Sequence, residues 1–269
     1  MTLVAGNIYF ELTRAFNAAG PIVALASGQA VVYYRIAIMS KDGDWVIRET
    51  AEACGQVLDV LAERGAVYRA GAPLDPRWLA GGWSSHFEFV DDKRRRVRCD
   101  FFSRPPRVNV SRIAPLFEGS VGELLVVDLE SLIRMKHTQR AKDYAVIGEL
   151  AARLPPEQEI QFTTDPDRLL TLAPSYQGAV TRAAIHAASV GDRDGVVVAL
   201  AREQDALQRI DRARVLAYAA AAEPYLAEFG KMSSADRRLP DAHARLVARA
   251  ERLLPVAVAV QENVDADVE

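Results

Sequence analysis

The feature that most constrains the fold is a change of composition past the middle of the chain. Residues 1–155 mix strand and helix patterns, whereas the rest is dominated by alanine, leucine and charged residues at helical spacing. The change falls in "RLPPEQEIQFTTDPD", where Pro155 and Pro156 stop one helix and Asp165-Pro166 can start another. We therefore expect a first domain at 1–155, a helical domain at 156–258 and a disordered acidic tail at 259–269.

The first domain carries the patterns of a small sheet with helices. Strand-like segments are Ile22–Leu25, Asp44–Ile47, Leu124–Val127 and the two arms of "HFEFVDDKRRRVRCDFF", joined by a charged turn at 91–95. Helical patterns cover Ile8–Ala19, Ala30–Arg35, "ETAEACGQVLDVLAERGA", a segment from Leu129 and Tyr144–Arg153. The predicted fold class is α+β, a small mixed β-sheet with flanking helices and a C-terminal α-helical bundle.

Overall composition excludes several classes of protein. Half of the 269 residues are hydrophobic and the formal net charge is −3, so any contact with nucleic acid must come from a local basic patch. Cys54 and Cys99 have no ligand spacing, which argues against a zinc site or a disulfide framework. Because no apolar stretch is long enough to span a bilayer, we expect a soluble cytoplasmic protein without a membrane partner.

Two aspartates one residue apart precede an apolar run in "MSKDGDWVI", residues 39–47. On a strand, Asp42 and Asp44 would project the same way and their carboxylates would repel each other. A divalent cation removes that repulsion, because Mg²⁺ takes one or two carboxylate ligands while substrate phosphates complete its shell. The same spacing recurs at Asp165/Asp167, Asp192/Asp194 and Asp265/Asp267. Caps, turns or the tail explain those pairs, so the spacing alone does not identify a metal site.

A third aspartate, Asp100, lies in the strand-like segment "RVRCDFF". Alternation directs one set of side chains toward a core and leaves Asp100 on the opposite face. The inward set is Val97, Cys99 and Phe101, and the outward set is Arg98, Asp100 and Phe102. Asp100 is therefore either a third metal ligand or the partner of one of the many arginines of this hairpin.

Together these segments resemble the nucleotidyltransferase superfamily of DNA polymerase β, specifically its minimal, AbiEii-like bacterial branch. That superfamily has a Gly-Gly or Gly-Ser turn, then a spacer, then Asp-x-Asp on a strand, with a third carboxylate on a neighbouring strand. Here "SGQ" at 27–29, "KDGDWV" at 41–46 and "RCDFF" at 98–102 stand in the same order. The segment "VVDLESLIRMKHTQRAKDYAVIGEL" is similar to the strand-helix ending of the branch. The resemblance covers residues 8–155.

The sequence departs from the superfamily pattern at two positions. Gln29 stands where a serine or a second glycine usually follows the motif glycine, and Gly43 replaces the usual apolar residue between the aspartates. Gly28 can still bring backbone N–H groups close to a phosphate, and Gly43 removes no ligand. All three carboxylates are retained, which favours an active enzyme over a degenerate copy.

The resemblance implies a metal-dependent enzyme that transfers a nucleoside monophosphate from an NTP to a hydroxyl group. Its metal ligands would be Asp42, Asp44 and Asp100, with Mg²⁺ or Mn²⁺ as cofactor, and Lys136 would act with them in catalysis. The residues expected to bind the nucleotide are Ser27, Gly28, Gln29, Ser40, Arg140 and Lys142. Lys136 also lies near the end of its helix, where any cation complements the helix dipole, so both roles stay open.

One basic concentration stands out in this acidic chain, the hairpin Lys93–Arg98 with further arginines around it. It is either a solvated sheet edge or a surface that guides an RNA end toward Asp100.

Two functions of the whole chain remain in competition. The first is a nucleotidyltransferase acting on RNA, protein or a small molecule, with a toxin role beside a cognate antitoxin by analogy of fold. The alternative is a non-catalytic module of the same fold that binds a nucleotide or a partner protein. The sequence does not reveal the donor base, the acceptor or the oligomeric state.

Overall fold

The computed structural model describes residues 6–138 and 140–260, except for the side chains of residues 141 and 142. Packing divides this chain into two compact units, with breaks between Asp128 and Leu129 and between Leu216 and Ala217. We call the part up to Asp128 together with Ala217–Ala259 the sheet unit, and Leu129–Leu216 the helical unit. The acidic tail predicted to be disordered lies almost wholly outside the described residues, and the predicted domain boundary near residue 155 stays a prediction.

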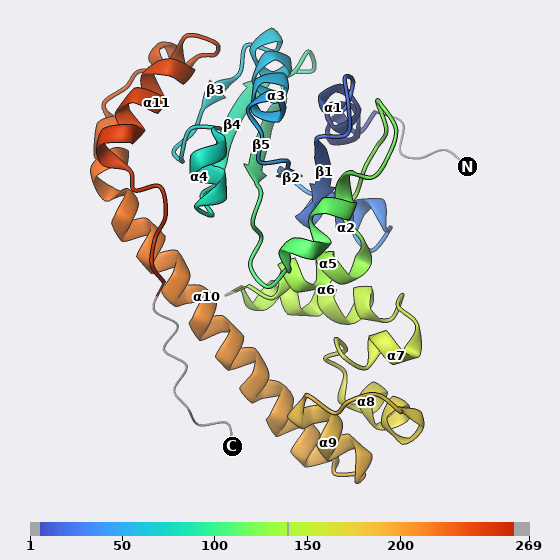
Figure 1. Cartoon of the computed structure of the whole chain (residues 1–269). Helices are drawn as coiled ribbons and strands as arrows, with labels where there is room; N and C mark the ends of the chain where they lie inside the picture. The colour runs from blue at the N-terminus through green and yellow to red at the C-terminus, as the bar shows by residue number, and fades with distance from the viewer. Residues whose placement is uncertain (1–5, 139, 261–269) are drawn as a thin grey trace. The chain divides into compact units, whose positions relative to one another are not determined.

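The sheet unit contains a five-stranded sheet with the order β1-β2-β5-β4-β3. The strands are β1 (Val23–Ala26), β2 (Gly43–Ile47), β3 (Val67–Tyr68), β4 (Ser85–Val90) and β5 (Arg96–Phe102). β2 and β5 run parallel and the other three pairs are antiparallel, so the sheet is mixed, as predicted. The segment predicted as a strand at Leu124–Val127 makes only a parallel bridge between Leu25 and Val126. The sheet therefore places the second aspartate segment, β5, directly beside the first, β2 (Figure 1).

Helices of the sheet unit come from both ends of the chain. They are α1 (Ile8–Phe16), α2 (Ser27–Tyr33), α3 (Ala51–Glu63), α4 (Pro76–Ala80), the last part of α10 (Arg193–Gly230) and α11 (Ala242–Leu253), with 3-10 turns η1 (Val110–Arg112), η2 (Ala114–Phe117) and η4 (Ala235–Arg237). Asn7 and Thr50 cap α1 and α3 by accepting hydrogen bonds from backbone N–H groups. The short elements β3 and α4 were not predicted from the sequence.

The core of the sheet unit is aromatic. Trp45 stacks on Phe101 with ring centroids 5.2 Å apart, and Phe16 of α1 meets both rings edge-on. Tyr225 of α10 and Leu246 of α11 are fully buried in the same cluster. Figure 1 shows α11 alongside the β3 end of the sheet. The last part of α10 and α11 thus contribute to the core of the sheet unit.

The helical unit contains α5 (Leu129–Lys136), α6 (Ala141–Ala151), α7 (Pro156–Glu159), α8 (Pro166–Leu172), η3 (Ala173–Ser175), α9 (Ala183–Ser189) and the first part of α10. Its small core gathers Ile160, Leu169, Ile185 and Val196. Within the predicted helical domain, α10 is one continuous helix, although it contains Pro224. The α+β class is confirmed, and the C-terminal part of the chain is helical as predicted.

Candidate functional site

Asp44 and Asp100 occupy opposite positions on two neighbouring parallel strands. Asp44 of β2 is the register partner of Asp100 of β5. Neighbouring strands lie about 5 Å apart, and directly opposed residues point to the same face of a sheet. In β5 the alternation is as predicted, since Val97, Cys99 and Phe101 are buried while Asp100 is partly exposed. The predicted approach of these two carboxylate-bearing positions is therefore present in the fold.

Asp42 lies just before β2 and contacts an arginine whose side chain lies on the same face of the sheet as Asp100. Arg98 Nη1 donates to Asp42 Oδ1 at 3.4 Å. Because Arg98 and Asp100 are two residues apart on β5, their side chains share one face. The third aspartate thus joins the side of the sheet that carries Asp44 and Asp100, with the Arg98 guanidinium beside it.

Asp100 is held by two side chains that the sequence analysis did not single out. His86 Nδ1 lies 2.9 Å from Asp100 Oδ1, and Arg69 Nη1 donates to the same oxygen at 3.2 Å. His86 stands opposite Asp100 in the antiparallel β4·β5 pair, and Arg69 follows β3. The alternation of "SHFEFV" indicates that His86 faces away from the core, but no local signal gives its register. The arginine partner expected for Asp100 therefore comes from outside the hairpin.

The Ser27-Gly28 turn joins β1 to α2 with an unusual backbone conformation. Ser27 has a φ of +46°, a left-handed value that is uncommon outside glycine. A Cβ at Gly28 would lie 2.3 Å from Ser40 Oγ, so Gly28 lets the segment before β2 pack directly on this turn. The predicted nucleotide-binding residues Ser27, Gly28 and Ser40 are thus adjacent in space.

Gln29 is buried and uses both ends of its amide within the protein. Its Nε2 donates to the Ser40 carbonyl at 2.8 Å, and its Oε1 accepts from Asn7 Nδ2 at 3.1 Å. Ser40 Oγ in turn donates to the Asp42 carbonyl at 3.4 Å. This departure from the superfamily pattern therefore ties the start of α1 to the segment that carries Asp42.

The burial of Gly43 explains the second departure. A Cβ at this position would lie 2.4 Å from the rings of both Tyr9 and Trp45. Tyr9 also donates a hydrogen bond to the Lys41 carbonyl at 2.6 Å, and burial, together with the nearby Cys99 and Asp42, raises the pKa of the Tyr9 hydroxyl to about 12. Two aromatic rings therefore occupy the space that a side chain at position 43 would need.

The remaining predicted residues lie in the helical unit. Lys136, the last residue of α5, is buried and its Nζ lies 3.5 Å from Asp143 Oδ1. Arg140 Nε and Thr138 Oγ1 both donate to Asp143 Oδ2 at 2.7 Å. Burial raises the pKa of Asp143, but the Thr138 hydrogen bond and the two cations outweigh it and lower this pKa overall. The side chain of Lys142, which begins α6 with Ala141, lies outside the described part of the chain.

Acidic partners neutralise much of the basic hairpin. Arg95 forms an ion pair with Asp91 across the turn at 2.7 Å, Arg96 lies 3.8 Å from Glu88, and Arg98 contacts Asp42. Within the described residues, the side chains of Lys93 and Arg94 at the tip make no hydrogen bond or ion pair. The hairpin tip therefore offers two solvated cations, fewer than its sequence suggests.

The donor chemistry of the three aspartates fits a hard divalent cation. Magnesium is commonly held by one or two carboxylates together with substrate phosphates, so Asp44 and Asp100 would be sufficient protein ligands. Over residues 6–138 and 140–260, no group of three or more histidine, cysteine, aspartate or glutamate side chains is arranged to hold a metal ion. The carboxylates share one face of the sheet, but they do not form a closed cage of three ligands.

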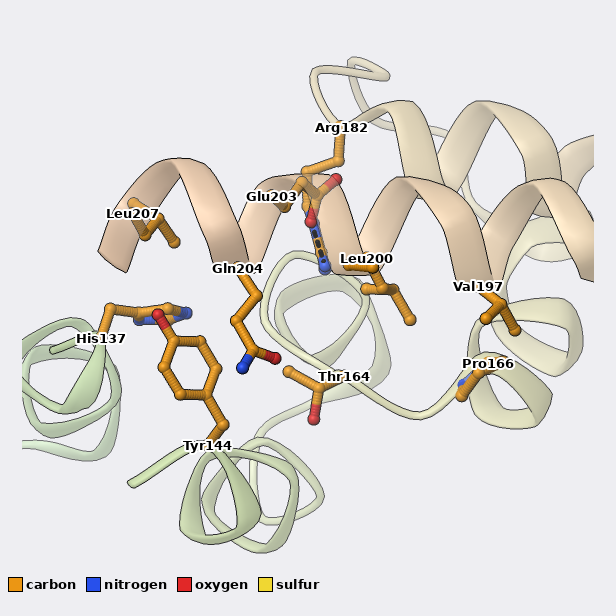
Figure 2. A pocket seen from close by; sticks show the side chains of 11 residues that line it. His137, Tyr144, Thr164, Pro166, Arg182, Val197, Leu200, Glu203, Gln204 and Leu207 are labelled. Carbon is orange, nitrogen blue, oxygen red and sulfur yellow. Dashed lines mark hydrogen bonds and ion pairs between the residues drawn. The ribbon is translucent and has the colours of Figure 1, made fainter. Parts of the chain in front are cut away.

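The helical unit contains a separate pocket of about 250 Å³. It is lined by residues of α10, of α6, of the segment after α5, of the start of α8 with the residues before it, and of the N-cap of α9: His137, Tyr144, Thr164, Pro166, Arg182, Val197, Leu200, Ala201, Glu203, Gln204 and Leu207. Figure 2 shows the Gln204 amide pointing between Tyr144 and Thr164. The Arg182 guanidinium is paired with Glu203 at 2.8 Å and also donates to the Thr163 carbonyl. The charged groups of this pocket therefore neutralise each other.

Comparisons with known proteins find only distant structural likenesses. No protein-family model matches the sequence, and no curated protein is significantly similar to it. A crystal structure from H. pylori, of a protein provisionally called a nucleotidyltransferase, is similar with a TM-score of 0.39 and 13% identity over 78% of this chain and 98% of that one. The crystal structure of JHP933 from Helicobacter pylori gives 0.39 and 14% over 81% and 99%. These likenesses are too weak to support an argument about fold or function.

In the described part of the chain, no helix combines the length and the apolar character that crossing a bilayer requires.

Proposed function

We propose that the chain is a metal-dependent nucleotidyltransferase, which transfers a nucleoside monophosphate from an NTP to a hydroxyl group. The observation that carries this proposal is the register of Asp44 opposite Asp100 on the parallel strands β2 and β5. Two carboxylates fixed on one sheet face repel each other in water, and a divalent cation relieves that repulsion.

Asp42, Asp44 and Asp100 would hold Mg²⁺ or Mn²⁺. When bound, the ion supplies charge stabilisation for the entering and leaving oxygens of an in-line displacement at the α-phosphate. In the proposed reaction, the attacking hydroxyl gives its proton to solvent water, the new P–O bond forms to its oxygen, and the bond from the α-phosphorus to the bridging oxygen breaks. The products are the nucleotidylated acceptor and pyrophosphate.

The nucleotide phosphates would bind near the β1-α2 turn. Ser27 and Ser40 offer hydroxyl groups on either side of Gly28, whose missing side chain permits this close packing. Gln29 would contribute by holding Ser40 in place, since both ends of its amide are already bonded within the protein. Lys136, Arg140 and Lys142 are proposed as further phosphate-binding cations, a role in which Lys136 would have to share its charge with Asp143.

The proposed acceptor is an RNA end, and the proposal rests on the positive charge of the hairpin tip. Lys93 and Arg94 at the hairpin tip are the cations that could attract an RNA end toward Asp100. A toxin role regulated by a cognate antitoxin, as in the AbiEii-like branch, is a proposal by analogy of fold.

One observation favours the alternative, a non-catalytic module that binds a nucleotide or a partner protein. Asp42 and Asp100 are both engaged by cationic or imidazole side chains, and the three carboxylates form no closed metal cage. In a pure binding module these contacts would be structural, and the site would need no metal.

The test is transfer of label from nucleotide to acceptor. The full chain is incubated with Mg²⁺ or Mn²⁺, a total cell extract and each α-³²P-labelled NTP in turn, beside an Asp44→Asn variant. Asp59→Asn is the matched control, because Asp59 is an exposed carboxylate on α3. Label that appears on RNA, protein or a small molecule with the parent and the control, but not with Asp44→Asn, supports the proposal. Equal labelling by Asp44→Asn contradicts it, and binding of nucleotide without any transfer favours the alternative.

A further inference from the structure

The contacts of Asp100 are unusual because they all fall on one oxygen. His86 and Arg69 both contact Oδ1, at 2.9 and 3.2 Å. Among the described residues, the side-chain hydrogen bond to this carboxylate goes to Oδ1, and none goes to Oδ2. A carboxylate fixed through one oxygen in this way presents its other oxygen in a defined direction.

The imidazole of His86 lies against the Asp100 carboxylate at ion-pair distance. Because an ionised carboxylate can only accept hydrogen bonds, a proton on Nδ1 makes this contact attractive. The contact is built into the sheet, because His86 and Asp100 are register partners of β4 and β5. Arg69 is placed by the same strand, since its backbone N–H donates to the His86 carbonyl at 2.8 Å.

Gly71 packs against the other side of the His86 imidazole ring. A Cβ at position 71 would lie 2.4 Å from His86 Cδ2 and 3.3 Å from Nε2, so only glycine leaves room for the ring in this position. The ring is therefore held between the Gly71 backbone and Asp100. Arg69 and Gly71, which follow β3, and His86 of β4 together fix one carboxylate of β5.

We infer that His86 and Arg69 are positioning residues that fix Asp100 as a metal ligand through its Oδ2 oxygen. The inference rests on the proposed function, because it takes Asp100 as a ligand of the catalytic cation. It adds a separate role for each oxygen of Asp100: Oδ1 contacts His86 and Arg69, and Oδ2 binds the ion. Residues that orient a metal ligand in this way typically change metal affinity or activity by about 10–100-fold when they are replaced.

The test measures Mn²⁺ binding to the full chain by electron paramagnetic resonance, which needs no acceptor and no turnover. His86→Leu removes the donor, whereas His86→Asn has a similar size and places an amide N–H near the position of Nδ1. We expect His86→Leu to weaken Mn²⁺ binding by about 10–100-fold and His86→Asn to retain most of the affinity. Arg69→Met should weaken binding as well, and it is a second route if His86→Leu does not fold. Circular dichroism and thermal melting without metal show whether each variant is folded.

Each outcome decides between the possibilities. Unchanged affinity in folded His86→Leu and Arg69→Met would overturn the inference and leave the proposed function standing. Equal loss in His86→Asn and His86→Leu would overturn it too, because it would make His86 itself a ligand. Absence of Mn²⁺ binding by the parent chain overturns both proposals. Weakened binding in His86→Leu, in a chain that never transfers label, supports the inference and contradicts the transfer reaction.

Discussion

The Tyr68 hydroxyl lies 2.8 Å from Nδ1 of His243 and links the sheet to α11. Tyr68 is fully buried in β3 and its oxygen also accepts a hydrogen bond from the Leu74 N–H at 3.2 Å. If the hydroxyl donates to Nδ1, the imidazole of His243 must be neutral, because a protonated Nδ1 cannot accept a hydrogen bond. Burial lowers the pKa of His243, and the nearby Asp75 only partly opposes this shift.

This pair predicts a pH dependence of stability. Because the folded-state pKa of His243 is lowered, the unfolded chain binds the proton first as the pH falls. The contribution of His243 to the free energy of unfolding is complete above its unfolded-state pKa of about 6.5. It is lost as the pH falls through the lower folded-state pKa. Urea denaturation of the parent and of His243→Gln at pH 7.5 and pH 5.5 measures it. The stability advantage of the parent should shrink at the lower pH, and a pH-independent difference would contradict the assignment.

The tight packing of Gly43 predicts that its substitution is harmful. In Gly43→Ala the new methyl group would overlap the Tyr9 and Trp45 rings, and overpacking of this kind costs about 1–3 kcal/mol. Gly55→Ala on α3 is the matched control, because a Cβ there meets no atom within 4 Å. It should be neutral or stabilise by up to about 1 kcal/mol. Thermal melting of both variants checks this, and equal stability of Gly43→Ala and the parent would show that the two rings can move.

The buried Asp143 predicts a large effect in the helical unit. Asp143→Asn would leave the buried Lys136 and its neighbour Arg140 without their carboxylate, which costs about 3 kcal/mol for a buried pair. Asp167→Asn is the comparison, since the Asp167 ion pair with Arg193 is exposed and should contribute little. Urea unfolding followed by circular dichroism measures both. Similar small losses in the two variants would indicate that water reaches the Lys136–Asp143 pair.

The core of the sheet unit predicts the outcome of a truncation. A chain cut after residue 155 lacks the buried Tyr225 and Leu246, and also the Leu254 carbonyl that accepts from the Trp78 indole at 3.3 Å. We expect it to lose cooperative unfolding. In the full chain, Tyr225→Ala should cost about 3–5 kcal/mol, as expected for a large buried side chain. A fragment of residues 1–155 that melts cooperatively would instead support the domain boundary predicted from the sequence.

Local patterns predicted the elements that local interactions determine. The alternation around Asp100 gave β5 and its buried face, and the charged turn of the hairpin gave the β4·β5 pairing. The apolar spacing of α1 and α3 was sufficient for both helices. The order of Asp42, Asp44 and Asp100 in the sequence indicated that β2 and β5 carry the candidate metal ligands. The register of these two strands then places Asp44 opposite Asp100.

The contacts that were missed depend on distant segments. His86 and Arg69 meet Asp100 only because β3, β4 and β5 adopt one particular register, which no single strand encodes. In the sequence, Gln29 is a departure from the phosphate-binding motif. In the structure, its hydrogen bonds to Asn7 and Ser40 connect two segments that are distant in the sequence, which no local pattern predicts. The helical spacing of α11 predicted a helix but could not predict what its apolar face covers.

The sheet unit takes its last helices from residues 217–259, after the whole helical unit in chain order. A ribosome that adds about 5–20 residues per second therefore finishes β5 on the order of ten seconds before it has made α10 and α11. During that interval the apolar side chains that will contact Tyr225 and Leu246 have no cover. We expect the nascent chain to need protection by a chaperone until translation is nearly complete, so a slow stretch of codons late in the message should lower the yield of folded protein.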